Sequence, residues 1–202
     1  MKLYYSPGAC SLSVNIALRE AGLAFEPVLA PTKTHQLPDG TDFHTINPLG
    51  YVPVLELDDG TRLREAGVVL QYIADQAPLK KLAPANGTLP RYRVQEWLTF
   101  ISSELHKSFS VLFNSAMPEE ARKIYRQKIE SRFKWVNAEL TGKEFLGPDF
   151  SVADIYLYVV TRWAQPMKLD LSPYPNLAAH HQRIAARPSV QEALKAEQLT
   201  TT

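Results

Sequence analysis

The pattern of apolar and polar residues changes character near residue 80. Before this point, residues 2–5 and 25–29 are short apolar runs typical of strands, and residues 10–22 between them follow a helical pattern that ends at a glycine. Residues 30–50 are rich in Pro, Gly, Thr and Asp, which predicts a loop with a weak helix. The first part of the chain therefore begins with a βαβ unit.

A hairpin and a helix follow this unit. Asp58-Asp59-Gly60 separates the apolar run 54–57 from the run 61–63, and Asp-Gly in such a position is a strong hairpin signal. Residues 67–74 then read as a helix. The order βαβ, irregular segment, ββα describes an α/β domain with a thioredoxin-like fold.

The second part of the chain contains only helical patterns. Prolines and a glycine break the segment 78–90, and helices are predicted over 91–113, from Pro118 onward, over 151–164 and over 176–187, where Pro188 ends the last one. Ser151 and Asp154 form a capping box, whose loss should cost about 1–2 kcal/mol. The predicted domains are 1–80 (thioredoxin-like), 81–89 (linker) and 90–202 (all-α).

Composition narrows the class of protein. The net charge of +1 and the lack of a long basic run argue against nucleic acid or a membrane surface as partner. No apolar stretch approaches the ~20 residues that span a bilayer, and the first residues do not resemble a signal peptide, so we expect a cytoplasmic protein. A single cysteine forms no internal disulfide and no multi-cysteine metal site.

That cysteine, Cys10, follows a strand and a Pro-Gly turn and opens a helix. The positive end of a helix and its open N–H groups stabilise a thiolate, so we interpret Cys10 as a functional thiol rather than a buried apolar residue. Position 13 is a serine, so no resolving cysteine of a C-x-x-C pair is present. An oxidised Cys10 would have to react with an external thiol, and glutathione is the obvious one.

Other candidates for binding lie beside the predicted elements. Val52-Pro53 precedes the third strand, where a cis proline would let an extended peptide pair with Val52. Glu65 and Ala66 begin a helix, so Glu65 would bind an amino group or simply favour the helix terminus.

A polar arc lies on the helix over 91–113. Its members Thr99, Ser103, His106 and Lys107 face away from the apolar stripe, which describes either a solvated face or a surface turned to the first domain. In the second case, His106 beside Lys107 would stabilise a thiolate.

Together these segments resemble the glutathione transferase family, and most closely its bacterial beta class, over essentially the whole chain. The matching segments are Tyr5-Ser6-Pro7-Gly8-Ala9-Cys10-Ser11, Asn47-Pro48-Leu49-Gly50-Tyr51-Val52-Pro53, Glu65, Leu105-His106-Lys107 and Ser151-Val152-Ala153-Asp154. The resemblance implies the glutathione transferase architecture, glutathione as co-substrate, a homodimer and no metal.

The resemblance also implies a role for each site residue. Cys10 and His106 would approach the glutathione sulfur, Val52 would pair with the cysteinyl backbone, Glu65 and Ala66 would hold the γ-glutamyl end, His35 and His106 would lie near the glycyl end, and Thr99 and Ser103 match positions that reach glutathione across the dimer interface. Further candidates for binding glutathione are Ser11, Pro53 and Lys107. His35 replaces a lysine, Ala66 a serine and Thr99 an asparagine that are common in the family, which predicts modest affinity. Lys33 is an alternative partner for the glycyl carboxylate.

The expected activity is the transfer of glutathione to a small hydrophobic electrophile, with thiol–disulfide exchange through a Cys10–glutathione mixed disulfide as a second activity. The alternatives are a non-catalytic binding or stress-regulatory protein on the same scaffold, and a glutathione-dependent dehalogenase or isomerase. Candidates for the electrophile pocket, most of them equally suited to a core, are Phe109, Phe113, Tyr156, Trp163 and Met167.

Overall fold

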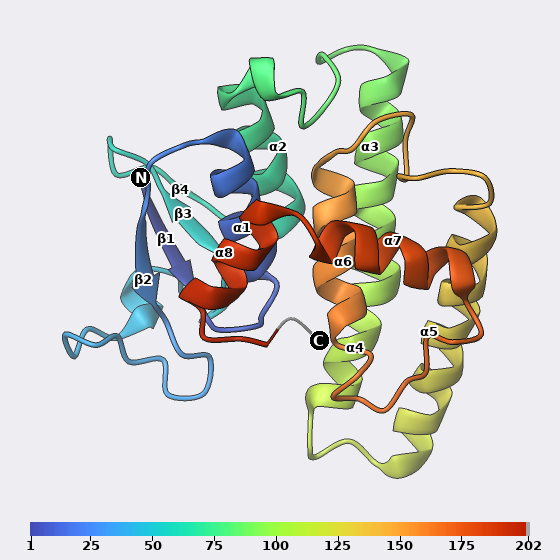
Figure 1. The fold of residues 1–202 in the computed structure, drawn as a ribbon. Coiled ribbons are helices and arrows are strands. Elements are labelled where there is room, and N and C mark those ends of the chain that lie inside the picture. The colour runs from blue at the N-terminus through green and yellow to red at the C-terminus, as the bar shows by residue number, and fades with distance from the viewer. Residues whose placement is uncertain (201–202) are drawn as a thin grey trace. The chain divides into compact units, whose positions relative to one another are not determined.

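The computed structural model describes residues 1–200 and divides into two compact units (Figure 1). Unit 1 contains Met1–Ala83 and the chain from Pro188 onward, and unit 2 contains Pro84–Arg187. The predicted helical domain, 90–202, differs from unit 2 at its end, because the segment after Arg187 packs with unit 1.

Unit 1 is built on a four-stranded sheet with the order β2-β1-β3-β4. β1 pairs in parallel with β2, which confirms the βαβ unit, and antiparallel with β3, where Leu3 lies opposite Leu55. β3 and β4 form the predicted hairpin, with Leu55 opposite Leu63. The strands are β1 (Lys2–Tyr5), β2 (Glu26–Leu29), β3 (Val54–Glu56) and β4 (Arg62–Leu63).

Helix α1 (Ser11–Ala21) is buried on almost every side because it packs against the sheet, α2 (Ala66–Gln76) and α8 (Pro188–Ala196). Gly22 ends α1 in the left-handed region at φ 68°, which glycine adopts without steric cost, and its N–H donates to Arg19 O over 3.0 Å. The loop between β2 and β3 contains the predicted weak helix, one 3₁₀ turn at Phe43–Thr45, and a second 3₁₀ turn at Pro78–Lys80 follows α2.

The prediction that the last helix ends at Pro188 is incomplete, because Pro188 begins a further helix, α8. Proline is tolerated in the first turn of a helix, where its missing N–H would have no intrahelical partner. Polar contacts tie the segment to α1: Asn15 Nδ2 donates to Glu197 Oε1 over 2.9 Å, and Arg19 pairs with Glu192 over 3.3 Å.

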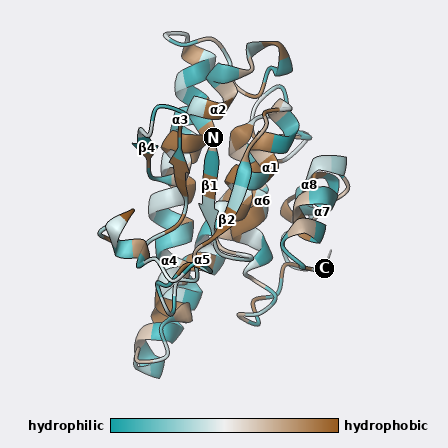
Figure 2. Cartoon of the chain, turned by 90° about the vertical axis from the view of Figure 1, so that its left-hand side faces the viewer, coloured by the Kyte–Doolittle hydropathy of each residue, from teal (hydrophilic) through white to brown (hydrophobic). Residues whose placement is uncertain are grey.

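Unit 2 is helical throughout. The single helix predicted over 91–113 consists of three segments, because a π-helical stretch at Ile101–His106 separates two α-helices. Along the helices, apolar residues are interspersed with polar ones, as the brown and teal segments of Figure 2 show. The α-helices are α3 (Leu89–Phe100), α4 (Lys107–Phe113), α5 (Glu119–Glu139), α6 (Val152–Arg162) and α7 (Pro175–Ala185).

The capping box at the start of α6 is confirmed. Ser151 Oγ accepts from Ala153 N, and Asp154 Oδ2 accepts from Ser151 N over 2.8 Å. Asp154 is fully buried, and its other oxygen accepts from Leu146 N and lies 2.9 Å from His180 Nε2. This carboxylate therefore joins the loop before α6 to α7. Across residues 1–200, no helix is both long and apolar enough to cross a membrane.

Candidate active site

Cys10 lies where β1 leads into α1, at the N-cap position of the helix, and only 8% of the residue is exposed. Its Sγ donates to Val52 O over 3.2 Å. The turn before it needs Gly8, whose φ is 71°. The structure thus brings the cysteine to the backbone of Val52, although 42 residues separate them in the sequence.

Ser11 is fully buried and holds this turn together. Its Oγ donates to Ser6 O over 3.2 Å and accepts from Ser6 N over 3.1 Å. The hydroxyl is thereby engaged with the backbone of the turn, so it positions the cysteine rather than facing outward. Tyr5, the last residue of β1, has its pKa raised by burial and by the Glu197 carboxylate.

Two further candidates of unit 1 lie at backbone positions with unusual geometry. The Val52–Pro53 bond is cis, as the sequence suggests, and directly precedes β3. Glu65 occupies the N-cap position of α2 with φ 65°, a conformation that residues other than glycine rarely adopt. Its side chain is exposed, whereas Ala66 is buried. The strained backbone at the start of α2 is typical of a functional position.

His35 also has a positive φ, 54°, and its ring lies against that of His44 with 4.5 Å between the centroids. His35 Nδ1 is buried without a hydrogen-bond partner. A Cβ at Gly50 would lie 2.8 Å from His35 Cε1, so the absence of a side chain there makes room for the ring. His44 Nδ1 in turn contacts Asp42 Oδ1 at 2.9 Å.

The polar arc of unit 2 overlaps the π-helical stretch, which contains Ser103 and His106. Thr99 and Ser103 are exposed, and their hydroxyls donate to the carbonyls of Gln95 and Thr99, so each is satisfied within the helix. Lys107, the first residue of α4, is exposed. π-helical turns often occur at functional sites, and this one ends at His106.

His106 is largely buried, and its Nδ1 shares a hydrogen bond of 2.7 Å with the Tyr156 hydroxyl. Burial, together with the positive charge of Lys107, lowers the pKa of His106 to about 4. The imidazole is therefore neutral at pH 7. A role in stabilising a thiolate would come from a hydrogen bond rather than from a positive charge, which changes the interpretation made from the sequence.

His181 lies on α7, where its Nδ1 contacts Thr161 Oγ1 of α6 at 2.8 Å. Burial first, and then the charges of Arg162 and His180, lower its pKa to about 4. We expect the free energy of unfolding to fall as pH drops from 6.5 toward 4.5. Over this range the two histidines bind protons in the unfolded chain but stay neutral in the folded protein. From the ordinary value of 6.5, two such residues account for a loss of roughly 2–5 kcal/mol at pH 4.5.

Urea denaturation at several pH values measures this loss. The variant H181Q should flatten the profile, whereas H44Q, which changes an exposed histidine, should leave it unchanged. An unfolding free energy that stays constant between pH 7 and pH 4.5 would contradict the assignment.

A cluster of aromatic rings surrounds His106. The Trp163 ring lies 4.9 Å from His106 and 5.4 Å from Phe113, measured between centroids. Phe109, Tyr156 and Trp163 are buried core residues, whereas Phe113 is 48% exposed. Of the pocket candidates from the sequence, only Phe113 and the half-buried Met167 thus present substantial surface.

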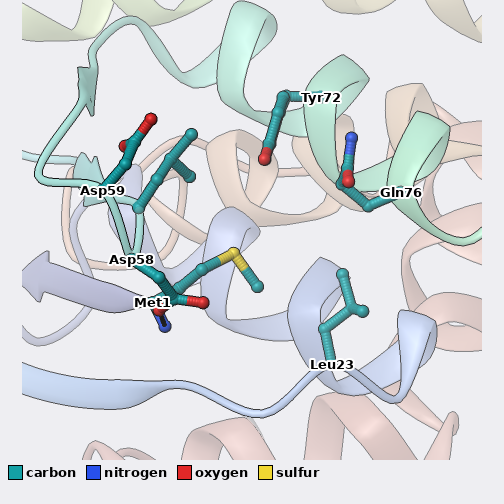
Figure 3. A pocket seen from close by; sticks show the side chains of 7 residues that line it. Met1, Leu23, Asp58, Asp59, Tyr72 and Gln76 are labelled. Atoms are coloured by element: carbon teal, nitrogen blue, oxygen red, sulfur yellow. Dashed lines mark hydrogen bonds and ion pairs between the residues drawn. The ribbon is translucent and has the colours of Figure 1, made fainter.

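A hollow of about 390 Å³ in unit 1 lies elsewhere (Figure 3). It opens beside the start of β1, whereas Cys10 follows the other end of that strand, and no predicted site residue lines it. We therefore do not assign the chemistry to it. Its lining consists of Met1, Leu23, Leu57, Asp58, Asp59, Tyr72 and Gln76.

Sequence reasoning named Tyr156 only as a pocket candidate and missed that it holds the His106 ring. It missed two residues altogether: His44, which packs on His35, and Glu197, which accepts from Gly8 N over 3.0 Å. Each of these residues contacts a partner that is 9 to 189 positions away in the sequence, and no local pattern indicates such a pair. Among the described residues, no group of three or more His, Cys, Asp or Glu is arranged to hold a metal ion.

Comparison with known proteins adds an independent finding. The family model "Glutathione S-transferase, N-terminal domain" matches residues 8–76, and "Glutathione S-transferase, C-terminal domain" matches residues 100–188. Glutathione S-transferase GstA of Escherichia coli O157:H7 is 44% identical over 200 residues, covering 98% of this chain and 100% of that protein. The chain belongs to the glutathione S-transferase family.

Two solved structures narrow the assignment. A sphingomonad glutathione S-transferase complexed with glutathione is 46% identical, with a TM-score of 0.95, covering 99% of this chain and all of that one. A bacterial beta class glutathione S-transferase from Sphingomonas chungbukensis is 48% identical, with a TM-score of 0.96 and the same coverage. Within the family, this protein is of the bacterial beta class, and the predicted architecture is confirmed.

Proposed function

We propose that this glutathione transferase binds glutathione beside Val52 and uses Cys10 both to hold the glutathione sulfur and to exchange disulfides with it. The observation that carries the proposal is the 3.2 Å contact between Cys10 Sγ and Val52 O. This contact places the Cys10 thiol next to the backbone of Val52, just before β3. An extended peptide would pair with this backbone. The relative solved in complex with glutathione supports this choice of ligand.

In this proposal each end of the tripeptide has its own partner. The cysteinyl backbone pairs with Val52, next to Pro53. The γ-glutamyl ammonium binds the exposed Glu65 carboxylate, and its α-carboxylate accepts from the first N–H groups of α2, at Ala66. The glycyl carboxylate binds His35, with Lys33 as a second cation. Thr99 and Ser103 complete the site from the other subunit of a homodimer.

Conjugation requires the glutathione thiolate. The thiol loses its proton to solvent, and the anion is stabilised by the N-terminal end of α1 and by hydrogen bonds from Cys10 and from His106, with Lys107 nearby. We assign the His106 tautomer in which Tyr156 donates to Nδ1, so that Nε2 carries the proton that is donated. The thiolate attacks a carbon of the electrophile, a C–S bond forms, and the leaving group departs with the bonding electron pair.

Disulfide exchange uses Cys10 as the nucleophile. Its thiolate attacks a mixed disulfide of glutathione and another thiol, the other thiol leaves, and a Cys10–glutathione disulfide remains. A second glutathione thiolate then attacks this disulfide, which releases oxidised glutathione and restores Cys10. The disulfide substrate is the oxidant and glutathione the reductant, so the cycle needs no resolving cysteine. This chemistry depends on a reduced glutathione pool, which is why we place the enzyme in the cytoplasm.

Glu65 offers a test of the binding mode. We expect Glu65→Gln to weaken glutathione binding about tenfold or more, because the amide keeps the size of the side chain and removes its charge from the ammonium. Isothermal titration with glutathione measures the effect. Titration with a glutathione analogue that lacks the γ-glutamyl amino group should show no difference between Glu65→Gln and the parent protein.

Equal affinity of both proteins for glutathione would contradict the assigned role of Glu65. The matched control is Glu96→Gln, because Glu96 is an exposed carboxylate of α3 that pairs with Arg93 over 2.7 Å and has no part in the proposed site. If the parent protein bound no glutathione at all, the non-catalytic alternative on this scaffold would replace the enzyme. A dehalogenase or isomerase would share the site and differ only in the electrophile it accepts.

A further inference from the structure

Two arginines lie on the inward-facing stripe of α5. The stripe consists of Ile129, Phe133 and Val136, all fully buried, and toward the start of the helix its next positions are Arg126 and Arg122. At 3.6 residues per turn these five side chains share one face. The helix therefore directs charge, rather than apolar surface, toward the end of the core next to α4.

Both arginines bind backbone at the edge of the aromatic cluster. Arg122 Nη2 donates to Asn114 O over 2.8 Å, and Asn114 directly follows Phe113. Arg126 Nη1 donates to Met167 O, and the N–H of Met167 donates in turn to Trp163 O. Arg122 is thus anchored to the residue that follows Phe113, and Arg126 to a residue one turn after Trp163, and the rings of Phe113 and Trp163 lie 5.4 Å apart.

Neither charge is neutralised by the protein. Within residues 1–200, neither Arg122 nor Arg126 lies within 4.0 Å of a carboxylate, and Arg122 Nε is buried without a hydrogen-bond partner. A guanidinium has five N–H donors, most of which remain available here. Like charges one turn apart destabilise a helix. The nearest acids along α5, Glu119 and Glu120 before Arg122 and Glu130 four residues after Arg126, are all exposed.

Exposed apolar surface adjoins these cations. Phe113 is 48% exposed and Met117 36%, and the N–H of Met117 donates to the same Asn114 carbonyl that Arg122 binds. An aromatic ring resting on Phe113 would bring a substituent within reach of the guanidinium groups. Arginine binds carboxylates in a planar, two-pronged geometry that suits this arrangement.

We propose that Arg122 and Arg126 select electrophiles that are aromatic and carry a carboxylate. This inference rests on the proposed transferase function and names the substrate class of that site. The competing explanation is that the arginines only secure the chain after α4 and after α6. The two explanations differ in one respect, since a structural role affects charged and neutral electrophiles equally.

The test compares two matched electrophiles, 4-chloro-3,5-dinitrobenzoate and 4-chloro-3,5-dinitrobenzamide, by kcat/KM with glutathione. Both lose chloride, and they differ in the charge and in the electron withdrawal of one substituent, so each kcat/KM is divided by the uncatalysed rate constant of the same compound. The native enzyme should prefer the benzoate. The ratio of the two kcat/KM values should fall about tenfold in Arg126→Gln or Arg122→Gln and about a hundredfold in the double variant. Lys123→Gln, a charge change at an exposed position of α5, should leave the ratio within about twofold.

Because both rates are measured on the same sample, the ratio does not depend on the folded fraction of a variant. The variants Arg122→Lys and Arg126→Lys keep the charge and should retain part of the preference. An unchanged ratio in the double variant, or no preference for the benzoate in the native enzyme, would overturn the inference and leave the transferase function standing. Failure to conjugate either compound, or any other halonitrobenzene, would overturn the transferase function itself.

Discussion

Replacing Cys10 by alanine is expected to abolish glutathione-dependent disulfide reduction and to leave most of the conjugation rate. The first activity needs the Cys10 sulfur as the attacking nucleophile, so the loss of this activity should exceed about a thousandfold. The second activity loses only a hydrogen bond from a weak donor, worth about 1 kcal/mol or about fivefold in rate. Reduction of a glutathione mixed disulfide and conjugation of 1-chloro-2,4-dinitrobenzene, measured on one preparation, give the two rates.

Cys10→Ser is the matched control for this experiment. A serine hydroxyl can donate to the glutathione thiolate in place of the Cys10 thiol, and it forms no disulfide. Conjugation should therefore be closer to the native rate than in Cys10→Ala, while reduction should be equally absent. Disulfide reduction that survives in both variants would refute the mixed-disulfide mechanism. Conjugation lost as completely as reduction would mean that Cys10 is essential to both.

Replacing Asp154 by alanine is expected to cost about 3–5 kcal/mol of unfolding free energy, which is a large part of the stability of an ordinary domain. The carboxylate is fully buried, and its oxygens accept from Leu146 N, from Ser151 N and Oγ, and contact His180 Nε2. Removing it leaves several buried donors without an acceptor. The loss should exceed the 1–2 kcal/mol that the capping box alone predicts.

Ser151→Ala separates the cap from the rest of this network, because it removes one acceptor for Ala153 N and leaves the carboxylate in place. It should cost about 1 kcal/mol. Urea denaturation at pH 7 measures both variants, and glutathione titration of the folded fraction should show native affinity. A loss below about 1 kcal/mol for Asp154→Ala would mean that water replaces the carboxylate at these donors.

Local signals in the sequence account for much of the fold. Asp58-Asp59-Gly60 predicts the β3–β4 hairpin, Gly22 the end of α1, and Ser151 with Asp154 the start of α6, and the structure confirms all three. Each of these signals depends only on residues within a few positions of one another along the chain. The parallel pairing of β1 with β2 also follows, because a helix between two strands predicts a crossover connection.

Features that depend on distant contacts were not predictable. The π-helical stretch at Ile101–His106 cannot be recognised from the sequence, because the segment keeps apolar residues on one face throughout, as a continuous α-helix does. α8 was missed because Pro188 signals the end of one helix and the start of another equally well, and its packing on α1 decides between them.

The candidate site divides in the same way. Cys10 was identified from its place between a strand and a helix, whereas its contact with Val52 follows from the folded sheet. The neutral state of His106 could not be predicted either, because it arises from burial and from Lys107 in the folded protein. The sequence suggested His106 as a partner for the thiolate, and burial leaves that partner uncharged.

The central claim is that Cys10 bonds covalently to glutathione, and the intact mass of the protein measures this directly. After incubation with oxidised glutathione and removal of excess reagent, the native chain should gain the mass of a single glutathionyl group, which dithiothreitol removes and which Cys10→Ser never acquires. A native chain whose mass stays unchanged under conditions in which it binds glutathione would contradict the account.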